Sequence, residues 1–199
     1  MISYKENILK GEKKMQPISR KELFTIPNLM GYFRILLIPF FAYVYCTANT
    51  DSEYYLAAAI IGLSGFTDLL DGKIARKYNM VTEFGKFLDP LADKLTQAAL
   101  VFCLTTKYTW MWALVVIFVV KEGFMLVMGA IFLRKGKKLN GAMWFGKVCT
   151  AVLYLVMFLL LVFPNINIVA ANSMIVLCGI IMVITLGLYV PVFNKMGKE

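Results

Sequence analysis

Histidine is absent from the 199 residues of this chain. Its absence excludes catalytic triads that contain histidine, histidine-ligated zinc and a histidine general base. Cysteine is scarce, and the four cysteines lie singly in four different apolar segments, at Cys46, Cys103, Cys149 and Cys178. Because they lack the paired spacing of a zinc site, we interpret them as small buried hydrophobic residues.

Acidic residues and long polar stretches are also scarce. The chain has 12 Asp and Glu against 21 Lys and Arg, a net charge of +9. It is 60% hydrophobic with a mean hydropathy of +0.71, well beyond a soluble domain. We therefore predict a cytoplasmic arm or amphipathic helix over 1–22, followed by one membrane domain over 23–199. The basic residues lie in short loops between apolar runs, which favours anionic lipid over nucleic acid as the partner.

Six apolar segments are long enough to predict six transmembrane helices in an all-α integral membrane protein. They cover approximately 29–48, 54–71, 88–105, 109–133, 142–163 and 168–193. Lysine and arginine gather in the N-terminal arm, in alternate loops and in the C-terminal tail, whereas the loops between have little positive charge. This positive-inside pattern predicts a multi-pass protein of the cell membrane with both termini in the cytoplasm.

Four aspartates, a third of all acidic residues, interrupt the hydrophobic pattern. Asp68 and Asp71 are three residues apart, and Asp89 and Asp93 are four apart, so each pair shares one helical face. The link from Gly72 to Leu88 is expected to return the chain so that the two faces meet. Ionisable groups at membrane depth are costly and usually functional. We therefore predict the active site here, at the cytoplasmic side.

Four carboxylates this close would repel one another strongly, and divalent cations would remove the repulsion. Ligation by oxygen alone suits magnesium, manganese or calcium. Two ions bridged by carboxylates are typical of phosphoryl chemistry, in which they clamp the attacking and leaving oxygens. Gly72 and Gly85 would allow a bulky ligand to approach the backbone, and Arg76 would pair with a phosphate.

The run that contains the aspartates is DLLDGKIARKYNMVTEFGKFLDPLADK. It resembles the signature of the CDP-alcohol phosphatidyltransferase family, D-x2-D-G-x2-A-R-x8-G-x3-D-x3-D, at every fixed position. The segment FTIPNLMGYFRILLIPFF at 24–41 and Gly146-Lys147 resemble two branches of this family, the phosphatidylglycerophosphate synthases and the cardiolipin synthases. The resemblance covers most of the chain from about residue 23.

The resemblance implies the six-helix CDP-alcohol phosphotransferase fold, a homodimer and two divalent ions, Mg²⁺ or Mn²⁺. The donor would be CDP-diacylglycerol, whose β-phosphorus is attacked by an acceptor hydroxyl while CMP leaves. Asp68, Asp71 and Asp89 would hold the metals, and Asp93 would complete the second metal site and act as the base. The CDP site would be lined by Asp68, Asp71, Gly72, Ala75, Arg76 and Gly85.

The acceptor is expected to be glycerol 3-phosphate, with phosphatidylglycerol as the alternative. A phosphate on the acceptor needs cations, and the candidates are Lys121, Lys147 and Arg134, with the neighbouring lysines 135, 137 and 138. The glycerol-phosphate branch typically has an Arg-Glu pair in the fourth helix and a further arginine two turns later. Here the pair is Lys121-Glu122 and the later position is Gly129, which keeps the alternative open.

Two further alternatives do not require a transferase. The aspartates could form a buried ion-pair network with Lys73, Arg76, Lys86 and Lys94, or a cation site in a transporter or channel. The ion-pair network explains neither the glycines nor the spacing of the aspartates. The transporter leaves Gly72, Arg76 and Gly85 without a role. We therefore favour the enzyme.

Overall fold

The computed structural model of the chain describes residues 20–134 and 143–198. Its secondary structure there is helical throughout. A short turn of helix, α2 (Arg20–Leu23), precedes six long helices. These are α3 (Ile26–Thr47), α4 (Asp51–Lys77), α5 (Glu83–Leu104), α6 (Met111–Arg134), α7 (Trp144–Val162) and α8 (Ile168–Lys198). The predicted all-α class and the six segments are confirmed.

The prediction for the link between the two aspartate pairs is wrong in its extent. Helix α4 continues past Gly72 to Lys77, and α5 begins at Glu83, so the link is a five-residue turn over 78–82. Asn79 adopts a left-handed φ of 52°, and the Met80 N–H donates to the Ala75 carbonyl at 2.9 Å, an arrangement that closes helix ends. The polar residues of this stretch are typical of a loop, but 72–77 form the last turns of α4 and 83–88 the first turns of α5.

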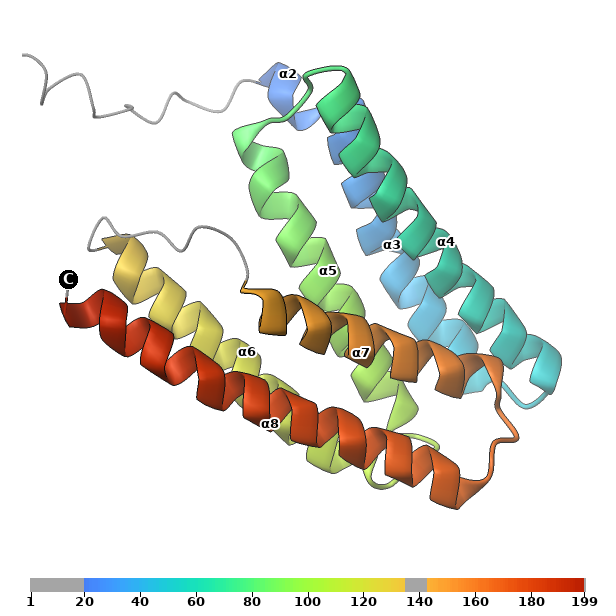
Figure 1. Cartoon of the computed structure of the whole chain (residues 1–199). Coiled ribbons are helices and arrows are strands. Elements are labelled where there is room, and N and C mark those ends of the chain that lie inside the picture. Colours follow the sequence, from blue (N-terminus) through green and yellow to red (C-terminus); the bar gives the residue numbers. More distant parts are fainter. Residues whose placement is uncertain (1–19, 135–142, 199) are drawn as a thin grey trace, which may run out of the picture.

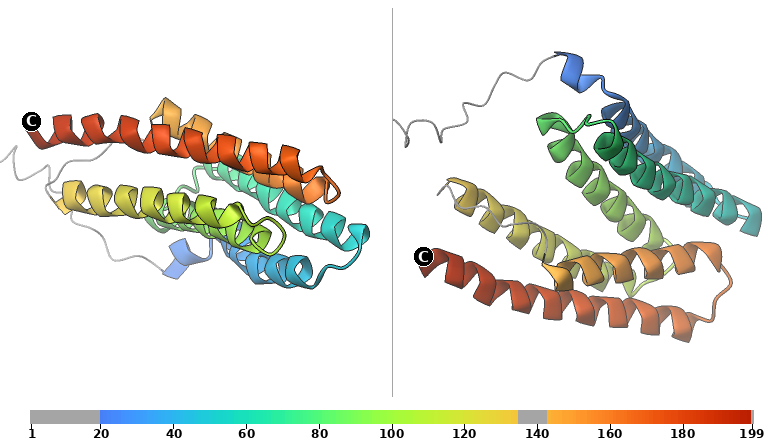
Figure 2. Two further views of the ribbon diagram at one scale, coloured as in Figure 1. Left: turned by 90° about the horizontal axis from the view of Figure 1, so that it is seen from below. Right: turned by 45° about the horizontal axis from the view of Figure 1, so that its top comes forward.

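The helices form two groups of three (Figure 1). In the first, α3 packs against both α4 and α5. In the second, α8 packs against both α6 and α7. Contacts of α4 with α7, and of α5 with α6 and α7, join the groups, and the views in Figure 2 show α7 lying between α8 and the first group. A buried apolar core that draws on all six long helices fills the interior.

Four helices are long and apolar enough to cross a membrane: α3, α6, α7 and α8, the last over Ile168–Gly197. Helices α4 and α5 fall short of that standard because each carries a pair of aspartates and several other charges. The outside of the molecule is rich in exposed apolar side chains, such as Leu36, Leu126 and Val169, with 69%, 73% and 69% of their surface exposed. An apolar exterior suits lipid rather than water, so this is a multi-pass membrane protein.

The connections alternate between two ends of the helix bundle. The turn after α4, the end of α6 and the start of α7 belong to the end where α3 begins, and the loops 48–50, 105–110 and 163–167 belong to the other. Which end faces the cytoplasm stays a prediction. The arm over 1–22 lies mostly outside the described residues.

Cysteines introduced at the two ends of α4 should react from opposite sides of the membrane. Ser52 and Lys77 are both exposed. In a Cys46→Ser background, Ser52→Cys is expected to react with a membrane-impermeant maleimide added to intact cells, and Lys77→Cys only after permeabilisation. The background variant alone is the control, because Cys103, Cys149 and Cys178 are buried. The reverse labelling pattern would place the aspartates outside the cell.

Candidate active site

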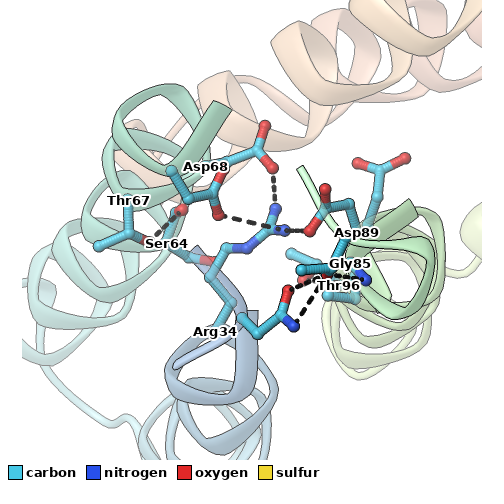
Figure 3. Close-up of polar contacts among 12 residues, drawn as sticks. Arg34, Ser64, Thr67, Asp68, Gly85, Asp89 and Thr96 are labelled. Carbon is cyan, nitrogen blue, oxygen red and sulfur yellow. Dashed lines mark hydrogen bonds and ion pairs between the residues drawn. The ribbon is translucent and has the colours of Figure 1, made fainter. Parts of the chain in front are cut away.

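Arg34 of α3 lies at the centre of the aspartate cluster (Figure 3). Its guanidinium forms an ion pair with Asp68 through Nη1, and its Nη2 lies 3.6 Å from Asp71 Oδ2 and 3.7 Å from Asp89 Oδ1. Three of the predicted metal ligands, from two helices, therefore surround one cation from a third helix. The sequence around Arg34 gives no sign of this contact, because nothing in its neighbourhood fixes where helix α3 packs.

The members of this cluster differ in burial. The Arg34 side chain is 3% exposed and that of Asp71 is 4% exposed, whereas Asp68 and Asp89 are about half exposed. Three carboxylates against one guanidinium leave an excess of negative charge. Arg34 Nη2 and Asp71 Oδ2 are buried and form no hydrogen bond with the described residues. Buried polar atoms without partners are rare and call for an explanation.

Asp93 lies apart from this cluster. Tyr154 of α7 donates its hydroxyl to Asp93 Oδ1 at 2.6 Å, and Gln97 donates its Nε2 to Asp93 Oδ2 at 3.0 Å. Asp93 lies one helical turn beyond Asp89 on α5, so the two residues are on the same side of the helix, as their spacing predicts. The structure thus brings three aspartates onto one cation and gives the fourth two neutral donors.

One cavity connects the two environments. It has a volume of about 570 Å³, and its polar wall includes Arg34, Asp68, Asp93 and Tyr154, with Ser64 and Thr96. The remaining wall is largely apolar and comes from α4 and α7, with Ile61, Phe66, Leu69, Leu155 and Phe158. A ligand in this cavity would contact carboxylates at one end and hydrocarbon at the other.

The predicted CDP-binding glycines lie within helices and have different surroundings. A Cβ at Gly85 would lie 2.7 Å from Asn28 Oδ1 and 3.0 Å from Thr82 Oγ1. These side chains are hydrogen-bonded, with Asn28 Nδ2 to Thr82 Oγ1 at 3.1 Å, and they hold the start of α3 against the start of α5. Gly72 has more room, since a Cβ there would meet only Arg76 Nη2, at 3.7 Å. Gly85 therefore serves helix packing, whatever else it does.

Arg76 and Ala75 follow one turn after Asp71, at the end of α4. Arg76 is exposed, and within residues 20–134 and 143–198 it takes part in no ion pair of 4 Å or less. Two of the three lysines of the alternative ion-pair network pair elsewhere: Lys86 with Glu83 at 2.6 Å and Lys94 with Glu122 at 3.1 Å. The cluster is therefore not the network envisaged from the sequence, and Arg76 is available to an anionic ligand.

The three candidate acceptor cations differ in burial. Lys121 is buried and pairs with Glu122 at 2.5 Å, and Glu122 also pairs with Lys94. Lys147 and Arg134 are exposed on α7 and at the end of α6. The lysines 135, 137 and 138 lie outside the described residues. Of the three, Lys121 is linked to the site, because Lys94 hydrogen-bonds Gln97 at 3.1 Å and Gln97 bonds Asp93.

Comparison with known proteins identifies the family. The family model described as CDP-alcohol phosphatidyltransferase matches residues 24–190. The chain belongs to this family. Over 146 residues it is 36% identical to the CDP-diacylglycerol--glycerol-3-phosphate 3-phosphatidyltransferase of Escherichia coli K12, covering 72% of this chain and 80% of the relative. The proteins of the same description from Escherichia coli O157:H7 and Shigella flexneri serotype 5b match to the same extent.

CDP-alcohol phosphatidyltransferases generally depend on divalent metal ions. Among the described residues, no three carboxylates or thiols are placed to hold an ion directly, because the Arg34 guanidinium lies between Asp68, Asp71 and Asp89. The residues nevertheless fit such ions chemically. All the donors are oxygens, which hard cations prefer, and their charge exceeds that of Arg34. The buried Asp71 Oδ2 has no hydrogen bond in the described part of the chain, so its lone pairs are free to coordinate an ion.

Arg34→Met should destabilise the enzyme most when divalent cations are absent. Removal of one partner of a buried ion pair typically costs about 3–5 kcal/mol because the other charge is left without compensation. We expect a lower melting temperature in EDTA, and a larger recovery with Mg²⁺ in the variant than in the wild type. Arg76→Met, at an exposed position, is the control. If Arg34→Met lowers the melting temperature by the same amount with and without Mg²⁺, then Arg34 and the ions do not share these carboxylates.

Alanine at the two glycines should separate packing from ligand binding. Gly85→Ala is expected to lower the melting temperature, because its Cβ displaces the hydrogen-bonded Asn28 side chain. Gly72→Ala should leave the melting temperature unchanged yet reduce CMP release, since the space beside Gly72 is left for the ligand. Unchanged CMP release in folded Gly72→Ala would remove Gly72 from the CDP site.

Proposed function

We propose that the protein transfers the phosphatidyl group of CDP-diacylglycerol to glycerol 3-phosphate, which gives phosphatidylglycerophosphate for phospholipid synthesis. The observation that carries this is the cluster of Asp68, Asp71 and Asp89, with Asp93 across one cavity, in a chain of the CDP-alcohol phosphatidyltransferase family. The printed description of its relatives supplies the donor and the acceptor. The site would face the cytoplasm, where the acceptor is dissolved.

In the proposed reaction the acceptor hydroxyl oxygen forms a bond to the β-phosphorus. The bond between that phosphorus and the oxygen that bridges to the α-phosphorus breaks, and CMP leaves with the electron pair. Asp93 takes the proton of the acceptor hydroxyl. Its place in the wall of the cavity that Asp68 also lines supports this role, because a base must reach the proton that it removes.

Two divalent ions, Mg²⁺ or Mn²⁺, would be held by Asp68, Asp71, Asp89 and Asp93. When bound, they neutralise the diphosphate and stabilise the leaving CMP. Gly72, Ala75 and Arg76 lie at the end of α4 next to Asp71, where the CDP group would bind. The Arg76 guanidinium suits a phosphate, since its fork of donors matches phosphate oxygens. The apolar wall of the cavity suits an acyl chain.

Phosphatidylglycerol is a second candidate acceptor, which would make the protein a cardiolipin synthase. One observation favours it. Lys121 is already paired with Glu122, so its charge is partly used and less of it is left for a phosphate on the acceptor. In either case a homodimer in the membrane stays a prediction.

CMP release from CDP-diacylglycerol by the purified protein distinguishes the acceptors. We expect release with Mg²⁺ and glycerol 3-phosphate, loss of release in EDTA, and loss in Asp93→Asn because an amide takes up no proton. Lys121→Met should raise the KM for glycerol 3-phosphate about tenfold or more, since a charge-assisted contact is worth roughly 1.5–3 kcal/mol. Release with phosphatidylglycerol alone would assign the second candidate function, and full activity of Asp93→Asn would refute the base.

A further inference from the structure

We propose that Tyr154 and Gln97 together position the carboxylate of Asp93 for proton transfer. We call the two hydrogen bonds that they donate the carboxylate clamp. The inference rests on the proposed function, because it takes Asp93 as the base. Neither residue belongs to the aspartate signature, and Tyr154 lies about sixty residues beyond it on another helix.

The clamp fixes both oxygens of the carboxylate. Tyr154 donates to Oδ1 at 2.6 Å and Gln97 donates to Oδ2 at 3.0 Å. Two donors on two oxygens determine the plane of the carboxylate as well as its position, whereas one donor would leave it free to rotate. Each carboxylate oxygen can accept more than one hydrogen bond, so a free lone pair remains for the proton of an acceptor.

Both donors are neutral, which distinguishes Asp93 from the other three aspartates. Asp68, Asp71 and Asp89 all lie within ion-pair distance of Arg34. Hydrogen bonds from neutral groups are weaker than those from charged groups. The clamp therefore orients Asp93 without giving it a counter-ion.

A second hydrogen bond fixes the direction of the Gln97 amide. Lys94 Nζ donates to Gln97 Oε1 at 3.1 Å, which leaves Gln97 Nε2 to face Asp93. Lys94 is held in turn by Glu122 of α6 at 3.1 Å. Gln97 is 1% exposed, so water does not compete for its amide. A series of contacts from Glu122 on α6 through Lys94 and Gln97 therefore fixes which atom of the Gln97 amide faces Asp93.

Tyr154 reaches Asp93 from α7, whereas Gln97 lies on α5 with Asp93. Tyr154 lines the same cavity as Asp68 and Asp93. The clamp consequently ties α5 to α7 directly, and to α6 through Lys94 and Glu122. A displacement of about 1 Å at a reacting group is enough to reduce a rate about a hundredfold. The position of Asp93 relative to the donor phosphate therefore depends on residues outside the signature.

The first test compares Tyr154→Phe and Gln97→Met with the wild type in CMP release. Each variant keeps most of the side-chain volume and removes the donor. We expect kcat to fall about tenfold in each, in line with the loss of one hydrogen bond to a charged group. The KM for CDP-diacylglycerol should stay within about twofold, because the CDP site is formed by other residues. Tyr108→Phe is the matched control, since the Tyr108 hydroxyl is buried and makes no hydrogen bond in the described part of the chain.

The second test measures melting temperature and needs no activity. Tyr154→Phe is made in the wild type and in Asp93→Ala, both in EDTA. If the hydroxyl acts through Asp93, Tyr154→Phe lowers the melting temperature of the wild type and has a smaller effect in Asp93→Ala. The same decrease in both backgrounds would show that Tyr154 only packs, and would overturn the inference.

The two tests separate failure of the clamp from failure of the proposed function. Loss of CMP release in Asp93→Asn, with unchanged kcat in Tyr154→Phe and Gln97→Met, would overturn the clamp and keep the transferase. No CMP release by the wild type with either acceptor would refute the proposed function, and with it the role of the clamp in catalysis. An equal rise in KM and fall in kcat in the variants would indicate a general distortion and would also overturn it.

Discussion

Three carboxylates in a membrane protein require positive charge, and the arginine of a neighbouring helix supplies it. Asp68 and Asp71 lie on α4, Asp89 lies on α5, and the guanidinium of Arg34 on α3 is within ion-pair distance of all three. Arg34 and Asp71 are buried, and burial of a charge is unfavourable unless it is paired. This contact therefore sets how α3, α4 and α5 pack together. The five-residue turn after α4 and the bond from Asn28 to Thr82 fix the same arrangement from the ends of the helices. The cost of isolating these charges thus selects one packing of α3, α4 and α5.

In the proposed reaction, divalent ions neutralise the excess of negative charge that remains. One guanidinium balances one carboxylate, so the charge of the other two would be taken up by such ions or by a substrate that brings them. Asp93 is different, because neutral groups on α5 and α7 hold it at the edge of the same cavity. Asp68 and Asp93 both line this cavity, one paired with a cation and the other held by neutral donors, and in the proposed reaction Asp93 takes the acceptor proton in addition to binding an ion. Enzymes commonly give side chains of the same type different roles by placing them in different environments.

The sequence was a good guide where the pattern is local. Six apolar segments predicted six helices, and spacings of three and four placed each pair of aspartates on one face of a helix. The same local signals misjudged the ends of α4 and α5, since Gly72 and the charges after it suggested a loop where the helix continues to Lys77. Contacts between distant segments had no local signal at all. Arg34 precedes Asp68 by 34 residues and Tyr154 follows Asp93 by 61, so neither partner follows from periodicity or composition.

The position of Lys121 connects the question of the acceptor to the geometry of the base. Its ammonium is paired with Glu122, and Glu122 also holds Lys94, which orients the amide that bonds Asp93. An anionic acceptor that drew Lys121 towards itself would compete with Glu122 for that charge. Glu122 would then bind Lys94 alone, and the direction of the Gln97 amide would be held more firmly. Recognition of a phosphate on α6 and orientation of the base on α5 would in this way be coupled through one carboxylate. A neutral acceptor hydroxyl on a lipid would reach Asp93 without disturbing these contacts, so only an acceptor that carries a phosphate to Lys121 would couple its own binding to the orientation of the base.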